Sequence, residues 1–427
     1  MKRNRFVDCS VIGAALFAMF FGAGNMLFPP YLGLCAGRAW PKAFLGYYAA
    51  DVGLAVAAML ALARTGNAEM LFRPLGTRGS KVLMTAVVLC LGPLISIPRT
   101  AATTFELSVT PLWDNAPMPF FYAAFFALIY GLSGNKSALV DRVGTLLTPG
   151  LFFGLIYVIA RGVIAPLGTV PEVPQETSAL AEGIAAGYQT MDVLAAVVFG
   201  GLILDSVERK GYHKPHVQRY MTMGAGLVAG AGLLVVYLGL TYLGATAGAF
   251  GTTQWSRSEL LVELVGRLLP GTAGMLLFAG VAALACLTTA SALTGASAYY
   301  LSEVSQGKLS YRMAVVGICV FSGAVAGFGV ERLVVLATPV LQVVYPPVLV
   351  LILLSFTGIE DRVWFYRLPA LTALVISLWE VLGAFGVDVS FIERLPLAEL
   401  GFAWLFPAGM AAGLGLLLTS KGTDNYK

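Results

Sequence analysis

Apolar residues occur in long runs along the whole chain, and most runs are about as long as a helix needs to be to cross a bilayer. The runs lack the alternation expected of barrel strands, and in lipid each backbone polar group needs a partner within its own segment. We therefore expect an all-α polytopic membrane protein. Twelve spans are predicted, at about 6–34, 43–63, 82–110, 118–134, 143–165, 183–206, 220–247, 272–302, 311–328, 333–357, 366–386 and 401–419.

The distribution of Lys and Arg predicts the orientation of these spans, because cytoplasmic loops are enriched in both. With the N-terminus inside, 19 of the 27 basic residues fall in cytoplasmic segments, seven fall outside and Arg99 lies within a span. Both termini are therefore expected in the cytoplasm. The first apolar run is too long for a cleavable signal peptide and is expected to be a transmembrane helix.

Composition supports a membrane setting, since 58% of the 427 residues are hydrophobic and only 12% are charged. The five cysteines are scattered and are expected to fill the core rather than to form disulfides or a metal site. The net charge of +4 is spread over loops, so no nucleic-acid partner is predicted. The expected partners are membrane lipid and a small-molecule substrate, and the sequence leaves the oligomeric state open.

The first span is interrupted by polar and helix-weakening residues. Gly22, Gly24 and Asn25 precede Pro29 and Pro30 in an otherwise apolar run. A packing face or a simple kink would give a similar pattern. The functional alternative is a discontinuous helix whose unwound backbone binds substrate and ion near the middle of the membrane.

A weak internal repeat favours the discontinuous helix. Phe-Gly pairs occur in the first span and again in the sixth, at Phe199-Gly200, and Thr-Pro pairs occur in the fifth and tenth spans, at Thr148 and Thr338. Two repeats of five helices have opposite membrane orientations and place a binding site between them. The predicted organisation is a first repeat at 1–165, a second at 166–357, and two further spans with the C-terminal tail at 358–427.

Several short motifs closely resemble the bacterial branched-chain amino acid carriers, the leucine/isoleucine/valine:cation symporters. The resemblance covers about residues 8–419 and rests on the stretches Phe21–Asn25, Phe28–Pro30, Gly92-Pro93, Pro98–Thr100, Phe105-Glu106, Gly187-Tyr188, Thr190–Asp192, Phe199-Gly200, Tyr345–Pro347 and Arg394–Trp404. It implies Na⁺-coupled uptake of leucine, isoleucine and valine across the cytoplasmic (inner) membrane. It also implies the LeuT-type fold, with 5+5 inverted repeats and discontinuous helices 1 and 6.

An amino-acid zwitterion needs a partner for each of its charges. Ala23, Gly24 and Asn25 would offer free N–H groups to the carboxylate if the first helix opens there. Carbonyl groups freed near Phe199 and Gly200 would bind the ammonium group. Phe199 and Phe105 are candidates for the apolar wall around the substrate side chain, and the resemblance implies the same carboxylate site.

A sodium site is predicted in the eighth span. Ala285, Thr288 and Thr289 share one helix face and offer a carbonyl and two hydroxyl oxygens. The resemblance to LeuT-type carriers adds the carbonyl groups of Ala18 and Phe21. The alternative is that the threonine hydroxyls bond to carbonyls of their own helix or of a neighbouring one.

Three ionisable residues stand out within apolar spans, and each is a functional candidate because charge in a membrane is costly. Arg99 and Glu106 are seven residues apart and are expected to form a structural or gating pair, directly or through a neighbour. Asp192 is expected to line a vestibule or to cap a half-helix.

Other function classes fit less well. An intramembrane enzyme would need a nucleophile–base pair, a metal set or a carboxylate dyad, and the two histidines lie in one charged loop. A channel would more often show a re-entrant filter. Within transporters, the alternative is an H⁺-coupled carrier of another small neutral amino acid. Some LeuT-type relatives replace sodium by a lysine on span 5, and 143–160 holds no lysine.

Overall fold

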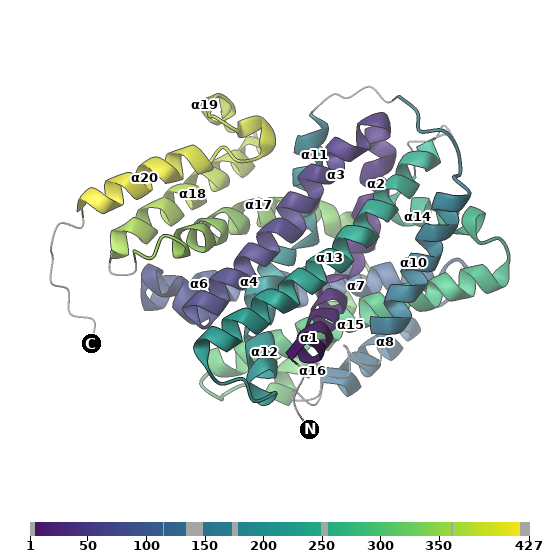
Figure 1. The fold of residues 1–427 in the computed structure, drawn as a ribbon, viewed down its shortest axis with the longest axis horizontal. Coiled ribbons are helices and arrows are strands. Elements are labelled where there is room, and N and C mark those ends of the chain that lie inside the picture. Colours follow the sequence, from purple (N-terminus) through teal and green to yellow (C-terminus); the bar gives the residue numbers. More distant parts are fainter. Residues whose placement is uncertain are drawn as a thin grey trace.

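The computed structural model describes residues 5–113, 115–133, 148–172, 178–248, 255–359 and 362–418, and these residues form a bundle of helices (Figure 1). Within them, seven helical stretches are long and apolar enough to span a membrane, at Ala23–Thr65, Ala68–Val109, Ala179–Arg209, Pro215–Ala247, Thr272–Val304, Val330–Ser355 and Val363–Gly383. Four shorter apolar helices accompany them: α8 (Met118–Ser133), α10 (Thr148–Ile164), α16 (Tyr311–Ala326) and α20 (Leu405–Leu418).

The first predicted span is broken, as its sequence indicates. Helix α1 (Arg5–Phe20) ends before Phe21-Gly22, and α2 (Ala23–Ala36) begins directly after this pair. Gly22 has an extended backbone, and an added Cβ there would lie 2.9 Å from Thr289 Cγ2 on a neighbouring helix. Pro29 and Pro30 lie inside α2 and do not end it. The break is therefore confined to two residues.

The two longest stretches are each built from several helices. Ala23–Thr65 turns at Gly37–Ala39 and continues as α3 (Trp40–Tyr48), a π-helical segment (Ala49–Gly53) and α4 (Leu54–Thr65). Ala68–Val109 holds α5 (Ala68–Phe72), a 3-10 turn (Arg73–Leu75), α6 (Gly76–Leu89), a π-helical segment (Cys90–Leu94), α7 (Ser96–Thr104) and another π-helical segment (Phe105–Val109).

The sixth span is also broken, but not where its glycines predicted. Helix α11 (Ala179–Thr190) ends at Met191, which has the left-handed φ of 68°, and α12 (Asp192–Arg209) follows. Phe199 and Gly200 lie within α12, so the predicted break at this pair was wrong. An added Cβ at Gly200 would collide with the side chain of Leu62 on α4. This glycine therefore serves close helix packing rather than helix interruption.

Helix α13 (Pro215–Ala247) lies against α2 with almost no side chain between the two backbones. An added Cβ at Gly33 would collide with the carbonyl oxygen of Thr241, and one at Gly244 would collide with that of Pro30. Helices α3 and α11 meet in the same reciprocal way through Gly46 and Gly183. These contacts fix both half-helices, α2 and α11, against their neighbours.

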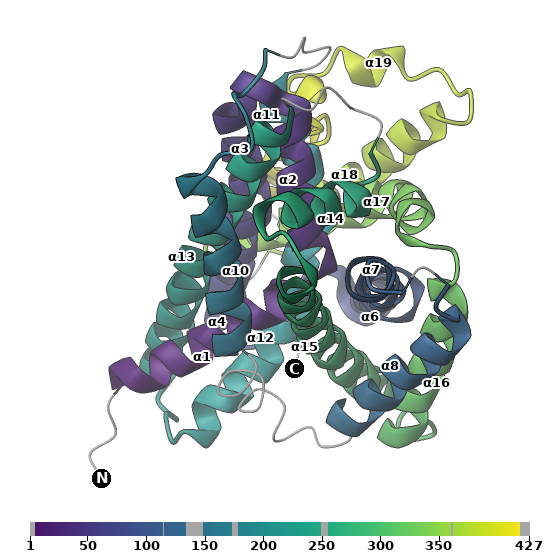
Figure 2. The same ribbon diagram turned by 90° about the vertical axis from the view of Figure 1, so that its right-hand side faces the viewer.

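The remaining helices surround this centre (Figures 1 and 2). Helix α15 (Thr272–Val304) packs against α7, α8 and α16, whereas α17 (Val330–Ser355), α18 (Val363–Gly383) and α20 lie together at the other side. The described residues also form three shorter elements: α14 (Arg257–Leu268), α19 (Ser390–Glu393) and a 3-10 turn (Ala398–Leu400).

The Thr-Pro pairs occupy different positions in their helices. Thr148 is the first described residue of α10, whereas Thr338 lies well inside α17 and bonds to Val334 O. The start of the fifth predicted span, 143–147, lies outside the described residues, as do 173–177 of the loop between the proposed repeats. The inverted repeat therefore stays a prediction.

Candidate functional site

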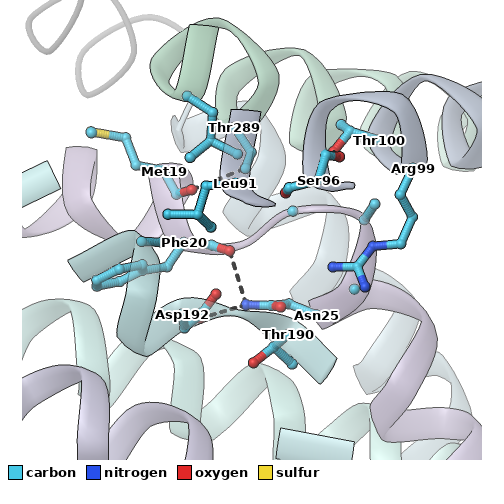
Figure 3. A pocket seen from close by; sticks show the side chains of 15 residues that line it. Met19, Phe20, Asn25, Leu91, Ser96, Arg99, Thr100, Thr190, Asp192 and Thr289 are labelled. Carbon is cyan, nitrogen blue, oxygen red and sulfur yellow. Dashed lines mark hydrogen bonds between the residues drawn. The ribbon is translucent and has the colours of Figure 1, made fainter. Parts of the chain in front are cut away.

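The two helix breaks face each other across a small cavity of about 20 Å³ (Figure 3). A cavity of this size has room for one or two water molecules, so the substrate expected from the sequence would enter only after the cavity expands. Its lining comes from both breaks, from α7 with the π-helical segment before it, and from α15: Met19, Phe20, Gly22, Ala23, Gly24, Asn25, Leu91, Ser96, Arg99, Thr100, Thr190, Asp192, Ala195, Thr289 and Leu293.

The N-terminus of α2 presents free backbone donors at this cavity. Ala23, Gly24 and Asn25 form its first turn, and Met26 is the first residue whose N–H bonds back to Gly22 O. Such a terminus carries partial positive charge and favours an anion. All three predicted carboxylate-site residues therefore line the cavity.

Arg99 adds a full positive charge beside these donors. Its side chain is buried at the cavity wall, and Nη1 donates to Gln189 O at the end of α11 over 2.8 Å. A Cβ added to Gly24 would lie 2.9 Å from Nη2, whereas Nε has no hydrogen-bond partner. The guanidinium therefore stands next to α2 with donor capacity to spare. A buried unpaired donor of this kind is a strong candidate for ligand binding.

The predicted sodium residues of α15 meet the C-terminal carbonyls of α1. Thr288 Oγ1 donates to Ala18 O over 3.0 Å and to Ala285 O over 2.8 Å. Thr289 Oγ1 donates to Met19 O over 3.0 Å and lies 3.4 Å from Ala18 O. Five oxygens thus gather at the negative end of the α1 dipole, where a cation is favoured. Met19 was missing from the prediction, and the carbonyl of Phe21 joins none of these bonds.

Asp192 is the first residue of α12 and lines the cavity opposite Arg99 (Figure 3). Its Oδ2 accepts from Asn25 Nδ2 over 2.7 Å. The same amide group also contacts Phe20 O over 2.9 Å and the hydroxyl of Tyr237. Asn25 therefore links the end of α1, the start of α12 and α13, which makes it a structural as well as a candidate binding residue.

Asp51 is a buried ionisable residue that the sequence interpretation missed. It lies in the π-helical segment Ala49–Gly53, is completely buried and accepts a 2.7 Å bond from Thr190 Oγ1. The signal was present, because an aspartate in the middle of the predicted span 43–63 is a functional candidate by default. π-Helical turns of this kind recur at functional sites.

Three predicted binding residues lie outside the cavity lining. Phe105 packs on Phe121 and Tyr122, away from both breaks. Phe199 contacts the ring of Phe20 at 6.0 Å between centroids, so it stands behind a lining residue, and Gly200 packs on α4. The structure brings the predicted residues of the first break together but separates these three from them.

The predicted pairing of Arg99 with Glu106 was wrong. Glu106 instead accepts from Ser258 Oγ over 2.5 Å and from Val330 N over 3.0 Å, so it joins the starts of α14 and α17. The helix changes from α to π geometry at Phe105, which breaks the register that a seven-residue spacing assumed.

An open hollow of about 810 Å³ lies near Glu106 and α14. Acidic residues dominate its charged lining, with Glu106, Glu259, Glu263 and Glu331 against Arg332. Hydrogen bonds from Ser256 hold the pKa of Glu259 below its usual value, so this carboxylate stays charged. A hollow with this charge attracts cations.

Two groups of contacts involve residues of the first predicted span. Towards the hollow, the Arg257 guanidinium pairs with Glu331 and stacks on Phe28 and Tyr31, at 5.4 and 4.7 Å from the ring centroids. At the opposite end of the first span, Asp8 of α1 lies 3.4 Å from Lys210 Nζ and accepts from Tyr212 over 2.8 Å.

Residues 6–421 match the family model "Branched-chain amino acid transport protein". The chain is 35% identical to the branched-chain amino acid transport system 2 carrier protein of Pseudomonas aeruginosa (98% of this chain, 97% of the relative). It is 33% identical to the branched-chain amino acid permease BrnQ of Escherichia coli K12 (96% and 95%).

Two solved structures share the fold. Mhp1, a nucleobase-cation-symport-1 family transporter in a closed conformation, has a TM-score of 0.62 at 16% identity, covering 96% of this chain and 93% of that one. A Na⁺-coupled sialic acid symporter in an outward-open state has a TM-score of 0.63 at 11% identity, covering 98% and 91%. The relatives are carriers and permeases rather than enzymes, and the chain is a multi-pass membrane protein that belongs to the branched-chain amino acid transport protein family.

Proposed function

We propose that this carrier imports leucine, isoleucine and valine together with Na⁺ by alternating access. The observation that carries the proposal is the convergence of two broken helices on one cavity, with an oxygen cluster at the end of α1. Discontinuous helices of this kind form midplane substrate and ion sites in secondary transporters.

The substrate fits the cavity by charge and by polarity. Its carboxylate would lie on the N–H groups of Ala23 and Gly24 and on the guanidinium of Arg99. Its ammonium group would face Asp192, and its aliphatic side chain would expand the apolar part of the wall, formed by Met19, Phe20, Leu91, Ala195 and Leu293. Among the described residues that line the cavity, one is a cation, Arg99, and one is a carboxylate, Asp192, which matches a zwitterion with a neutral side chain.

The ion would bind where Thr288 and Thr289 of α15 meet the carbonyls of Ala18, Met19 and Ala285. These groups are buried neutral oxygens, suited to a monovalent cation. Na⁺ would replace the hydrogen bonds of the two threonine hydroxyls and would hold α1 against α15. We include the Phe21 carbonyl as a further ligand, since it lies in the break beside them.

We further propose the organisation that the sequence predicted. Two inverted repeats of five helices would occupy 1–165 and 166–357, within a total of twelve spans with both termini in the cytoplasm of a bacterial inner membrane. Arg257–Glu331 would then close the outer path, and Asp8 with Lys210 and Tyr212 would close the inner one. Opening one group at a time would give alternating access.

The proposed coupling is tested by uptake of labelled leucine into proteoliposomes. An inward Na⁺ gradient should drive accumulation, and replacing external Na⁺ by K⁺ at constant pH should reduce the initial rate roughly tenfold or more, as a coupling free energy of the usual size implies. Accumulation driven by a pH gradient alone, with no response to Na⁺, would favour the H⁺-coupled alternative.

The inner contact group gives a separate prediction. Asp8→Asn removes the charge partner of Lys210, so we expect the inner side to open more often. For a partly exposed ion pair, the equilibrium between closed and open forms should shift by about fivefold. A cysteine label placed on the cytoplasmic part of α1 should then react faster in Asp8→Asn than in the parent. Equal labelling rates would remove this contact from the closing mechanism. Asp205→Asn, which breaks an exposed pair with Arg209, serves as the control.

A further inference from the structure

Two aspartates from different helices meet beneath the cavity. Thr190 Oγ1, two residues before Asp192, donates over 2.7 Å to Asp51 Oδ1, and the side chains of both aspartates are almost completely buried. Ionised carboxylates only accept hydrogen bonds and repel one another when buried close together. One proton on the pair removes this repulsion.

The charges around the two aspartates also favour one proton on the pair. The Arg99 guanidinium faces Asp192 and supplies one positive charge. Among the described residues, the other titratable groups that face the pair are the neutral hydroxyls of Tyr47, Tyr237 and Tyr345, and that of Tyr48 beside Asp51. Two ionised aspartates would leave one negative charge uncompensated in a dry interior, and that state is strongly disfavoured.

Buried polar atoms without a hydrogen-bond partner, next to the two aspartates, independently indicate that the pair holds a proton. Oδ2 of Asp51 and the hydroxyl of Tyr47 are both buried without a hydrogen bond of normal geometry, although the two residues lie side by side. Oδ1 of Asp51 is already engaged by Thr190, and Oδ2 of Asp192 by Asn25. The free oxygen of Asp51 therefore has capacity for one more hydrogen.

We propose that Asp51 and Asp192 together hold one proton in the substrate-free carrier, and that the ammonium group of the incoming amino acid displaces it. Asp192 lines the cavity and Asp51 does not, so the ammonium group would reach Asp192. It brings the positive charge that the proton supplied, and the proton leaves through the cavity to water. The ammonium group replaces the proton at the aspartates, and the substrate carboxylate pairs with Arg99. The Na⁺ of the proposed site, which adjoins the same cavity through Thr289, supplies the remaining positive charge. This inference rests on the proposed substrate orientation.

Proton displacement makes leucine binding depend on pH in a defined direction. Binding that releases a proton strengthens as pH rises, by up to about tenfold per unit, while the free pair is singly protonated and the occupied pair is not. The pH dependence of leucine binding would vanish above the pH at which the free pair loses its proton, because no proton then remains to be released.

Titration calorimetry on the purified protein measures the affinity for leucine and the number of protons released on binding. Leucine is titrated at constant saturating Na⁺ and at pH about 7, in buffers of different ionisation enthalpy. We expect release of about one proton per leucine bound. Heat of binding without proton release, or with proton uptake, would overturn the inference and leave the proposed function intact. Absence of leucine binding would instead contradict the proposed function.

Asp51→Asn tests the location of the proton. The introduced amide can accept from Thr190 and donate to Asp192, as the protonated acid would, but it has no proton to release. We expect leucine to bind without proton release and with little pH dependence. Asp205→Asn on the exposed end of α12 is the matched control and should release protons as the parent does. Parent-like proton release from folded Asp51→Asn would overturn the assignment to this pair.

Discussion

Replacing Gly24 by leucine is expected to abolish leucine uptake, with a loss of at least about a hundredfold in both binding and transport, since the added side chain removes the close approach on which backbone recognition depends. The position leaves no room. An added Cβ would lie 2.9 Å from Arg99 Nη2 and 3.4 Å from Thr190 Cα, so even the first side-chain atom would press on both walls of the cavity. The remaining atoms of leucine would fill the space between the two breaks.

The measurement is binding and uptake of labelled leucine, with membrane expression quantified beside it. Gly201→Leu is the matched control, because that glycine is exposed on α12 and an added Cβ would meet nothing within 4 Å. The control should transport at a rate close to that of the parent. Near-normal leucine affinity in Gly24→Leu would show that the first break is not the binding site.

The break in the first span could be predicted because several residues there each disfavour a continuous helix. Glycine, asparagine and proline occur together there, and the open backbone is satisfied in the structure by groups that the same segment supplies, such as Asn25 to Phe20 O. The sixth span shows the limit of this approach. Its glycine at 200 allows α4 to approach, whereas the real break is at Met191, a residue type that rarely adopts a left-handed conformation.

The aspartate pair shows a second limit. A single sequence indicates that a charge is buried, but not which distant residue compensates for it. Asp51 and Asp192 are 141 positions apart in the sequence. Only the packing of α11 and α12 against the second span brings them together. The failed pairing of Arg99 with Glu106 has the same origin, since a helical-face argument assumes uninterrupted α geometry and a π-helical segment begins at Phe105.

Removing the two threonine hydroxyls of α15 is expected to have the largest effect on ion coupling. Thr288→Val with Thr289→Ala deletes two of the oxygens that meet the end of α1, without adding much volume. Half-saturating Na⁺ should rise by about tenfold or more, within the range of measured coupling free energies. Leucine affinity should fall at low Na⁺ and recover in part at high Na⁺, because coupling between two binding sites is reciprocal.

Thr294→Val is the matched control for this pair. Thr294 is buried on the same helix, its hydroxyl has no hydrogen-bond partner, and the isosteric change should leave the Na⁺ dependence unchanged. A purely structural role for Thr288 and Thr289 predicts a different result, namely reduced expression with an unaltered Na⁺ titration. A folded and active double variant that titrates with Na⁺ like the parent would place the ion elsewhere.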